Sequence, residues 1–379
     1  MTEKLYYIDS YMFNCSANVL ECIEKNGHFE TRLDHTVFFP EGGGQPGDSG
    51  YIGEVYVFDT HEKNGEIWHY TNEPIQIGSY ECQIDTNVRL SRMQCHSGEH
   101  IVSGLIHNIF GYENVGFHLS DNDVTIDISG SLSEEDIRKI ELLANEAVAK
   151  DFEVKTWFPS KEEAAVIPYR SKLDIEENLR LVEYEGYDIC ACCAPHVKRS
   201  GQIGVIKLLD FANYKGGVRI HMLCGIRALE DYQKKYASVL KISNLLSAKQ
   251  SEVFDAVERL KTENEKTKHE SGALRRALID EIIKNTLPTS GNLIFFTSLL
   301  DVASLRTLVN GAVLKCDGIC AAFSGEDGAY TFCMASKSID LKAKSKEIGE
   351  ALHGRGGGSP EMICGSVSAT RKEIEVYLK

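Results

Sequence analysis

Residues 228–285 place the strongest constraint on how this 379-residue chain can fold. The segment contains no proline and a single glycine, Gly272, and it mixes both charge signs at high density. Proline and glycine are the residues that most readily interrupt a helix, so this composition predicts a long helix. Such a helix divides the chain into a front part and a back part.

Apolar residues recur every seven positions along this segment, which favours a short coiled coil. The repeat consists of Val239, Leu246, Val253, Leu260, Thr267 and Leu274, of which only the threonine is polar. A coiled coil also needs a second apolar position in each heptad, and here that position holds Ile242, Lys249, Ala256 and Glu263, two of which are charged. A helix packed along its own domain therefore explains the pattern equally well.

The net charge of −15 is unevenly distributed along the chain. The first 225 residues hold 19 Lys and Arg against 36 Asp and Glu, whereas the remainder holds 22 against 20. An acidic front part is a poor non-specific binder of polyanions. Binding to nucleic acid is therefore expected from the back part, or from local basic stretches such as the one containing Lys215 and Arg219.

Composition indicates a folded cytoplasmic protein that does not enter a membrane. Hydrophobic residues make up 42% of the chain and charged residues 26%, which excludes global disorder. No apolar run approaches the roughly 20 residues needed to span a bilayer, and the first residues lack the apolar block of a signal peptide. We therefore expect the 12 cysteines to be reduced, and those near histidines to be candidate metal ligands.

The order of apolar runs predicts an α+β architecture in four parts. Residues 1–85 contain strand-like runs at 5–8, 36–39, 53–58 and 67–70, which is typical of a small β-barrel. Residues 86–226 combine helices at 89–110 and 133–151 with strands at 205–209 and 217–223, and residues 227–287 form the long helix. Residues 288–379 follow the breaker at 288–291 and combine strands at 292–297 and 318–323 with helices at 302–309 and 341–352.

Two distant strings together predict a metal site. His96 and His100 lie four residues apart on a predicted helix, so both imidazoles project from one face and can reach one ion. The string CACCAPH at 190–196 adds thiols and a third imidazole, and Cys192 has a CxxxH spacing with His196. Nitrogen and thiolate donors of this kind make up a tetrahedral zinc set.

The residues alone leave alternatives open at this site. Cys190 or Cys193 could replace Cys192 as the thiol ligand. Four protein ligands are typical of a structural zinc ion, which would make the chain a non-catalytic binding protein. Glu99 completes the string HSGEH, which fits the HxxEH pattern of inverted zinc peptidases, and its carboxylate could deprotonate water beside a metal. A position on a solvated helix face is the alternative for Glu99.

Two glycine-rich strings could bring backbone close to a ligand. Residues 36–45, TVFFPEGGGQ, place the hydroxyl of Thr36 and the amide of Gln45 around exposed backbone donors. The string lacks the Lys-Ser/Thr of a Walker loop, so it does not indicate a nucleoside triphosphate site. Residues 354–360, GRGGGSP, either form a flexible turn or approach a nucleic-acid backbone, with Arg355 on a phosphate.

Together these strings resemble the free-standing alanyl-tRNA editing proteins of the AlaX type, in their long form, which are related to the editing and C-terminal domains of alanyl-tRNA synthetase. The resemblance covers nearly the whole chain and is carried, in order, by residues 36–50, 96–100, 192–220 and 354–360. It implies a β-barrel with the glycine motif at 1–85, a zinc-binding editing domain at 86–226 and a helical spacer at 227–287. It also implies a C-terminal α/β domain at 288–379 that resembles the DHH-associated domain and serves tRNA binding and dimerisation.

The resemblance also implies a function in translation fidelity. It implies hydrolysis, without ATP, of the ester in tRNA-Ala mischarged with serine or glycine, by a homodimer that uses zinc. The implied metal ligands are His96, His100, Cys192 and His196, and the implied catalytic or pocket residues are Thr36, Gln45 and Glu99. The implied tRNA-binding residues are Lys215, Arg219, Arg355, Gly356, Gly357 and Gly358.

One departure from the family bears on specificity. Cys193-Ala194-Pro195 stands where the family often has Gly-Gly-Thr. Proline has neither the hydroxyl nor the amide donor of threonine, so a contact made there differs or is lost. We expect this to affect substrate discrimination more than the metal ligands.

Overall fold

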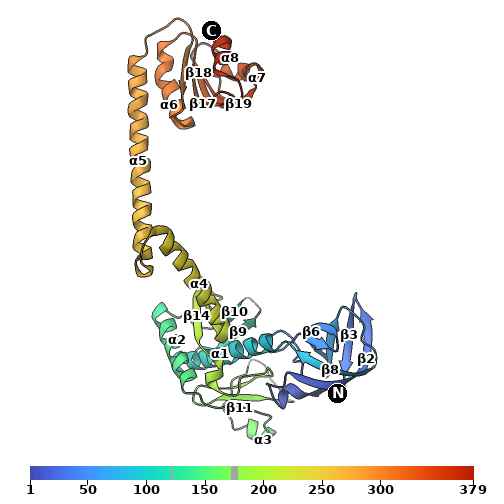
Figure 1. The fold of residues 1–379 in the computed structure, drawn as a ribbon. Helices are drawn as coiled ribbons and strands as arrows, with labels where there is room; N and C mark the ends of the chain where they lie inside the picture. The colour runs from blue at the N-terminus through green and yellow to red at the C-terminus, as the bar shows by residue number, and fades with distance from the viewer. Residues whose placement is uncertain (121–122, 172–177) are drawn as a thin grey trace. The chain divides into compact units, whose positions relative to one another are not determined.

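A computed structural model describes residues 1–120, 123–171 and 178–379 of the chain (Figure 1). The chain divides into two compact units, Met1–Ser238 and Val239–Lys379. Both units contain helices and a β-sheet, which confirms the expected mixed α+β class. The finer boundaries near residues 85, 226 and 287 stay predictions. Among the described residues, no helix is long and apolar enough to cross a membrane.

The first unit begins with a closed barrel of six strands in the order β2-β3-β7-β6-β5-β8. The strands are β2 (Asn14–Lys25), β3 (His28–Leu33), β5 (Gly50–Ile52), β6 (Val55–Lys63), β7 (Glu66–Thr71) and β8 (Gly78–Ile84). Alternation along β7 turns Ile67, His69 and Thr71 into the interior, where all three are fully buried. The barrel therefore encloses a polar histidine among its apolar side chains.

The expected strand at residues 5–8 is wrong. A short strand, β1 (Glu3–Lys4), pairs with β4 (His35–Thr36), and the chain then turns into a 3-10 helix, η1 (Leu5–Tyr7). The rings of Tyr6 and Tyr7 lie 4.6 Å apart. A strand would place neighbouring side chains on opposite faces, so this ring contact requires the turn.

The rest of the first unit is built around α1 (Thr86–Phe110). The carboxylate of Asp85 caps the start of α1 by accepting a hydrogen bond from the backbone N of Val88, and Gly111 ends the helix with a φ of 71°. Helix α2 (Glu134–Ala149) packs against α1 and begins with a capping box formed by Ser133 and Asp136. Two sheets complete this region.

A four-stranded sheet has the order β14-β15-β10-β9, and a three-stranded sheet has the order β11-β12-β13. Their strands are β9 (Asn114–Leu119), β10 (Val124–Ile128), β11 (Val154–Trp157), β12 (Leu181–Tyr184), β13 (Asp188–Ala191), β14 (Ile206–Tyr214) and β15 (Gly217–Cys224). The short helices are α3 (Lys161–Ala164) and η2 (Ser200–Ile203). Both sheets contact α1, so residues of this helix and of β13 can form one site.

The expected single helix over residues 228–285 is wrong in one respect, because it is broken. The segment forms α4 (Gly225–Leu246), η3 (Gln250–Glu252) and α5 (Val253–Asn285). At the break, Ser247 has a left-handed φ of 50°, and the hydroxyl of Ser243 donates to the carbonyl of Ala248 at 2.6 Å. A serine hydroxyl that bonds to the backbone competes with helix continuation, which explains the break without proline or glycine.

The second unit contains a five-stranded sheet in the order β16-β17-β18-β20-β19, in which only β16 and β17 pair in parallel. The strands are β16 (Leu293–Thr297), β17 (Ile319–Glu326), β18 (Ala329–Ser336), β19 (Gly354–Gly358) and β20 (Met362–Val367). The shorter helices are α6 (Val302–Ala312), η4 (Val313–Lys315), α7 (Leu341–Ala351) and α8 (Arg371–Tyr377). The glycine string at 354–358 is thus an edge strand, so the flexible-turn alternative is wrong.

Candidate metal centre

Helix α1 presents His96 and His100 to one buried point. The two residues lie one helical turn apart, and their rings are stacked with centroids 5.3 Å apart. Only 2% of His96 and 6% of His100 is exposed. The two imidazoles therefore lie on one face of α1, as their four-residue spacing predicts.

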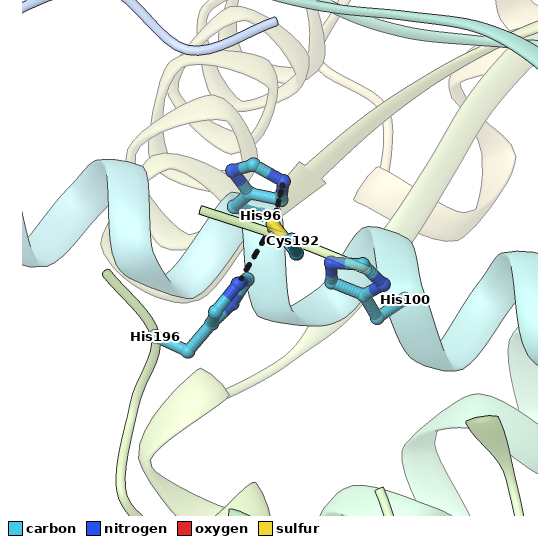
Figure 2. Close-up of side chains that lie close together, drawn as sticks. All are labelled: His96, His100, Cys192 and His196. Carbon is cyan, nitrogen blue, oxygen red and sulfur yellow. Dashed lines mark hydrogen bonds between the residues drawn. The ribbon is translucent and has the colours of Figure 1, made fainter. Parts of the chain in front are cut away.

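Cys192 and His196 reach the same point from the loop that follows β13. Arg180 fixes this loop, because its Nη1 donates to the carbonyls of Cys192 and Ala194, both at 2.9 Å. The hydroxyl of Ser10 donates to the carbonyl of His196 at 2.8 Å. Figure 2 shows the two imidazoles of α1 and the two loop side chains converging on one another.

The donor atoms of these four residues form a compact cluster. One ligand atom from each of His96, His100, Cys192 and His196 lies within 4.8 Å of the others. The Sγ of Cys192 is 3.5 Å from Nε2 of His96 and 3.2 Å from Nε2 of His196. This spacing is suited to a single ion bound among the four.

The two alternative thiols occupy other positions. The Sγ of Cys190 lies 3.0 Å from Nδ1 of His100 and joins a second cluster with His100 and Asp188. The sulfur of Cys193 packs against Gly42. The geometry therefore favours Cys192 as the thiol ligand.

Each of the three histidines has a hydrogen-bond partner at its second nitrogen. The partners of Nδ1 are Oε1 of Gln45 for His96 (3.1 Å), the carboxylate of Asp188 for His100 (3.2 Å) and the hydroxyl of Tyr184 for His196 (3.0 Å). Amide and carboxylate oxygens only accept, so Nδ1 of His96 and of His100 carries a proton and Nε2 is the nitrogen left for a metal. Three oriented imidazoles and one thiolate fit zinc.

Electrostatics favour a metal-binding state at Cys192 and His196. Burial raises the pKa of the Cys192 thiol, but His96 and His196 outweigh this effect and hold that pKa well below its usual value. Burial lowers the pKa of His196 to about 3. Burial also lowers the pKa of His100, but the negative groups around it raise that pKa well above its usual value, so a metal must displace a proton there.

A cavity of about 460 Å³ opens onto the cluster, and His96, His100 and Cys192 form part of its wall. Tyr7 and Phe117 contribute aromatic surface to the same cavity. The volume lies within the roughly 300–1,000 Å³ that is typical of small-ligand sites. A metal held by the cluster would therefore face a ligand in the cavity.

The glycine loop forms another part of the cavity wall. Gly43 and Gly44 have φ values of 61° and 80°, and a Cβ added to Gly44 would lie 2.6 Å from the carbonyl oxygen of Phe117. Only glycine tolerates both the left-handed backbone and this close approach. The run of glycines thus allows the backbone to pass directly beside the cavity.

Glu99 also lines the cavity, and only 3% of it is exposed. The alternative of a solvated helix face is therefore wrong, because α1 is buried on this side as well. Ser103 and Asn114 both donate hydrogen bonds to Oε1 of Glu99. Its other oxygen, Oε2, lies 3.9 Å from Nδ1 of His100. The carboxylate is thus oriented beside the candidate metal ligands.

Thr36 and Gln45 are both fully buried, and neither is among the described residues that line the cavity. The hydroxyl of Thr36 lies 2.8 Å from Nε2 of His69 and accepts a hydrogen bond from the backbone N of Phe38 at 3.1 Å. Gln45 contacts His96 instead. Direct contact of Thr36 with a substrate stays a prediction, whereas Gln45 is placed to orient the imidazole of His96.

The predicted tRNA-binding residues lie in both units. Lys215 and Arg219 belong to the β14–β15 hairpin, where their cationic groups lie 5.1 Å and 3.9 Å from the ring centroid of Tyr214. Arg219 also pairs with Asp127 at 2.6 Å. In the second unit, Arg355 and the glycines at 356–358 are exposed along β19.

Sequence reasoning missed the polar residues that support the cluster. These residues are Ser97, Ser103, Asn114, Arg170, Arg180, Tyr184 and Asp188. Ser97 and Ser103 lie on α1 with the two histidines, whereas strand pairing and loop packing bring the other five into place. A weak signal was present at Asp188, a charged residue that begins the strand run ending at Ala191.

Comparisons with known proteins agree with the motifs. Residues 179–221 match the family described as the threonyl and alanyl tRNA synthetase second additional domain. The chain is 27% identical to the alanyl-tRNA editing protein AlaX-L of Pyrococcus horikoshii, over 99% of this chain and 96% of that protein. It is 26% identical to an alanyl-tRNA editing protein of Danio rerio, over 98% of this chain and 96% of that protein. These matches confirm the resemblance to alanyl-tRNA editing proteins that the four strings predict.

Similarity also extends to larger proteins. The alanine–tRNA ligase of Halobacterium salinarum is 32% identical over 69% of this chain, which corresponds to 30% of that ligase. The chain thus spans less than a third of the length of that ligase. Among solved structures, the C-Ala domain from Aquifex aeolicus alanyl-tRNA synthetase matches with a TM-score of 0.21 and 17% identity, over 24% of this chain and 92% of that one.

Proposed function

Since the chain is related along nearly its whole length to alanyl-tRNA editing proteins, we propose that it is a trans-editing hydrolase that deacylates mischarged tRNA-Ala. One observation carries this proposal: the cavity wall combines the carboxylate of Glu99 with three of the four clustered metal donors. We propose serine, and secondarily glycine, as the amino acids removed. The four-part domain organisation and a cytoplasmic location belong to the same proposal.

We propose that His96, His100, Cys192 and His196 hold a zinc ion. Bound zinc supplies positive charge that stabilises the negative charge developing on the substrate. Gln45 contributes indirectly, because its Oε1 accepts the Nδ1 proton of His96 and so keeps Nε2 directed at the cluster.

Glu99 is the proposed general base. Ser103 and Asn114 occupy its Oε1, which leaves Oε2 to accept a proton from the attacking water. The water oxygen bonds to the ester carbonyl carbon, the bond to the ribose oxygen breaks, and the proton passes to that oxygen. The products are the free amino acid and a tRNA with a free 3′-terminal hydroxyl.

Polar groups in the cavity provide a basis for rejecting alanine. A site that pairs with the hydroxyl of serine leaves its own polar groups unpaired when alanine binds, at a cost of roughly 1–3 kcal/mol. Asn114 and Cys193 both belong to the residues that line the cavity. We propose that such groups face the amino acid and that Thr36 helps to shape the pocket around it.

The tRNA body is proposed to contact Lys215 and Arg219 in the first unit, and Arg355 with Gly356–Gly358 in the second. The chain is further proposed to form a homodimer through the heptad residues of α5. Leu260 and Leu274 support this proposal, because they are 53% and 72% exposed and occupy the same position of the seven-residue repeat. Light scattering of Leu260→Glu/Leu274→Glu tests it, and an unchanged dimer would remove α5 from that role.

The hydrolysis is tested by mixing the purified chain with seryl-tRNA-Ala and alanyl-tRNA-Ala and following ester loss. The wild type is expected to release serine rapidly and to spare the alanyl ester. His100→Ala should abolish release, whereas His107→Ala, which changes a more exposed histidine two turns further along α1, should retain it.

Loss of neither ester by a chain that binds zinc stoichiometrically would contradict the proposal. It would leave a structural zinc site in a tRNA-binding protein. Cleavage of casein or peptides instead of the seryl ester would identify the HxxEH string as that of a peptidase.

A further inference from the structure

Arg170 and Asp188 form an ion pair directly behind His100. Asp188 begins β13 and is 7% exposed, and its Oδ2 lies 3.2 Å from Nδ1 of His100. Arg170 closes the other side of this carboxylate, with Nε 2.8 Å from Oδ1 and Nη2 2.9 Å from Oδ2. A two-point contact of this kind fixes the plane of the carboxylate as well as its position.

The backbone strengthens this arrangement. The N–H of Arg170 donates to the carbonyl of Ile189 at 2.8 Å, and the N–H of Ala191 donates to the carbonyl of Arg170 at 2.9 Å. Arg170 is thereby anchored alongside β13, the strand that carries Asp188. The two side chains therefore start from fixed backbone positions, and neither can shift without straining the pair.

Two roles are possible for this buried group of charges. His100, Asp188 and Cys190 lie close enough to hold an ion of their own. However, the guanidinium of Arg170 contacts both oxygens of Asp188, which places a positive charge where a cation would have to bind. The remaining role is to support the neighbouring cluster through His100, the residue that the two groups share.

We propose that Arg170 and Asp188 are positioning residues that fix His100 as a metal ligand. This inference rests on the zinc site of the proposed function. Asp188 accepts the Nδ1 proton of His100, so Nε2 is the nitrogen presented to the metal, and Arg170 holds the carboxylate in the required plane. Arg170 also lines the cavity, so this residue forms part of the boundary of the proposed substrate space.

Zinc affinity of the full chain, measured by competition with a chromophoric chelator, tests this assignment. Asp188→Asn keeps the size of the side chain but presents an amide to Arg170 and His100, and we expect a roughly 10–100-fold loss of affinity. Arg170→Lys keeps the charge but loses the two-point contact, and we expect a smaller loss.

Asp127→Asn is the matched control for zinc binding. It breaks a pair with Arg219 of the same geometry, with contacts of 2.6 Å and 2.8 Å, away from the metal ligands. Its zinc affinity should equal that of the wild type. Wild-type affinity in both Asp188→Asn and Arg170→Lys would overturn the inference.

A cobalt-substituted protein separates positioning from a purely structural role. Altered orientation of His100 should shift the visible absorption bands of cobalt in Asp188→Asn, whereas lost stability alone would leave them unchanged. If Asp188→Asn does not fold, the spectrum and affinity of Arg170→Lys carry the test. If the wild type fails to hydrolyse seryl-tRNA-Ala but these metal effects appear, the proposed function fails and the inference stands.

Discussion

Acidification should destabilise the N-terminal barrel through one buried histidine. His69 is fully buried on β7, and its Nδ1 donates to the carbonyl of Thr31 at 3.0 Å. Its Nε2 therefore accepts a hydrogen bond from the hydroxyl of Thr36. Burial lowers the pKa of His69 from 6.5 to about 4, so the folded barrel favours the neutral ring.

The direction and size of the effect follow from this shift. The folded pKa of His69 lies below the unfolded value, so its contribution is complete above pH 6.5 and is lost as the pH falls toward 4. At pH 5 the ring is mostly protonated in the unfolded chain and mostly neutral in the folded barrel. With 1.36 kcal/mol per pKa unit, the free energy of unfolding should fall by about 2 kcal/mol between pH 8 and pH 5.

Urea unfolding followed by tryptophan fluorescence measures this change. Both tryptophans of the chain, Trp68 and Trp157, lie in the first unit, and Trp68 is the neighbour of His69. His69→Gln removes the titrating group. Between pH 8 and pH 5, the free energy of unfolding of the wild type should therefore fall by about 2 kcal/mol more than that of this variant. Equal losses of unfolding free energy in the wild type and in His69→Gln would contradict this prediction. His107→Gln, which changes a more exposed histidine, is the control and should behave like the wild type.

Three further predictions concern the ligands, the general base and the helix break. Cys192→Ser should lose stoichiometric zinc by metal analysis while Cys193→Ser keeps it, and equal zinc in both would contradict the choice of thiol. Glu99→Gln should lower kcat on seryl-tRNA-Ala roughly 100-fold or more with zinc retained, since the amide cannot accept the proton, whereas wild-type turnover would exclude a base role. Ser247→Gly should stabilise the chain by roughly 1 kcal/mol in thermal unfolding, because glycine tolerates the φ of 50°, and a lower Tm would count against strain at this position.

Local pattern predicts much of this fold. Helical spacing places His96 and His100 on one buried face, and the strand-like runs of the front part mark β7 within one residue and the start of β6 within two residues, although β6 continues five residues beyond the predicted run. The break between α4 and α5 escapes such reasoning, because it depends on one left-handed residue, Ser247, and not on a proline or glycine.

The site itself is only partly predictable from the sequence. Cys190, Cys192 and Cys193 are too close in sequence for spacing to decide among them, and the choice depends on where β13 ends. The supporting pair Tyr184 and Asp188 arises from the register of β12 with β13, in which these two residues are partners. Register between strands is a property of the assembled sheet, so no local string reports it.

The rate of seryl-tRNA-Ala hydrolysis as a function of bound zinc tests the central claim most directly. The metal is removed from the full chain with a chelator, and zinc is then returned in steps below one equivalent. If zinc is needed for hydrolysis, the rate should rise in proportion to bound zinc and saturate at one ion per chain, with the alanyl ester spared. Undiminished hydrolysis by a folded chain freed of metal would contradict it.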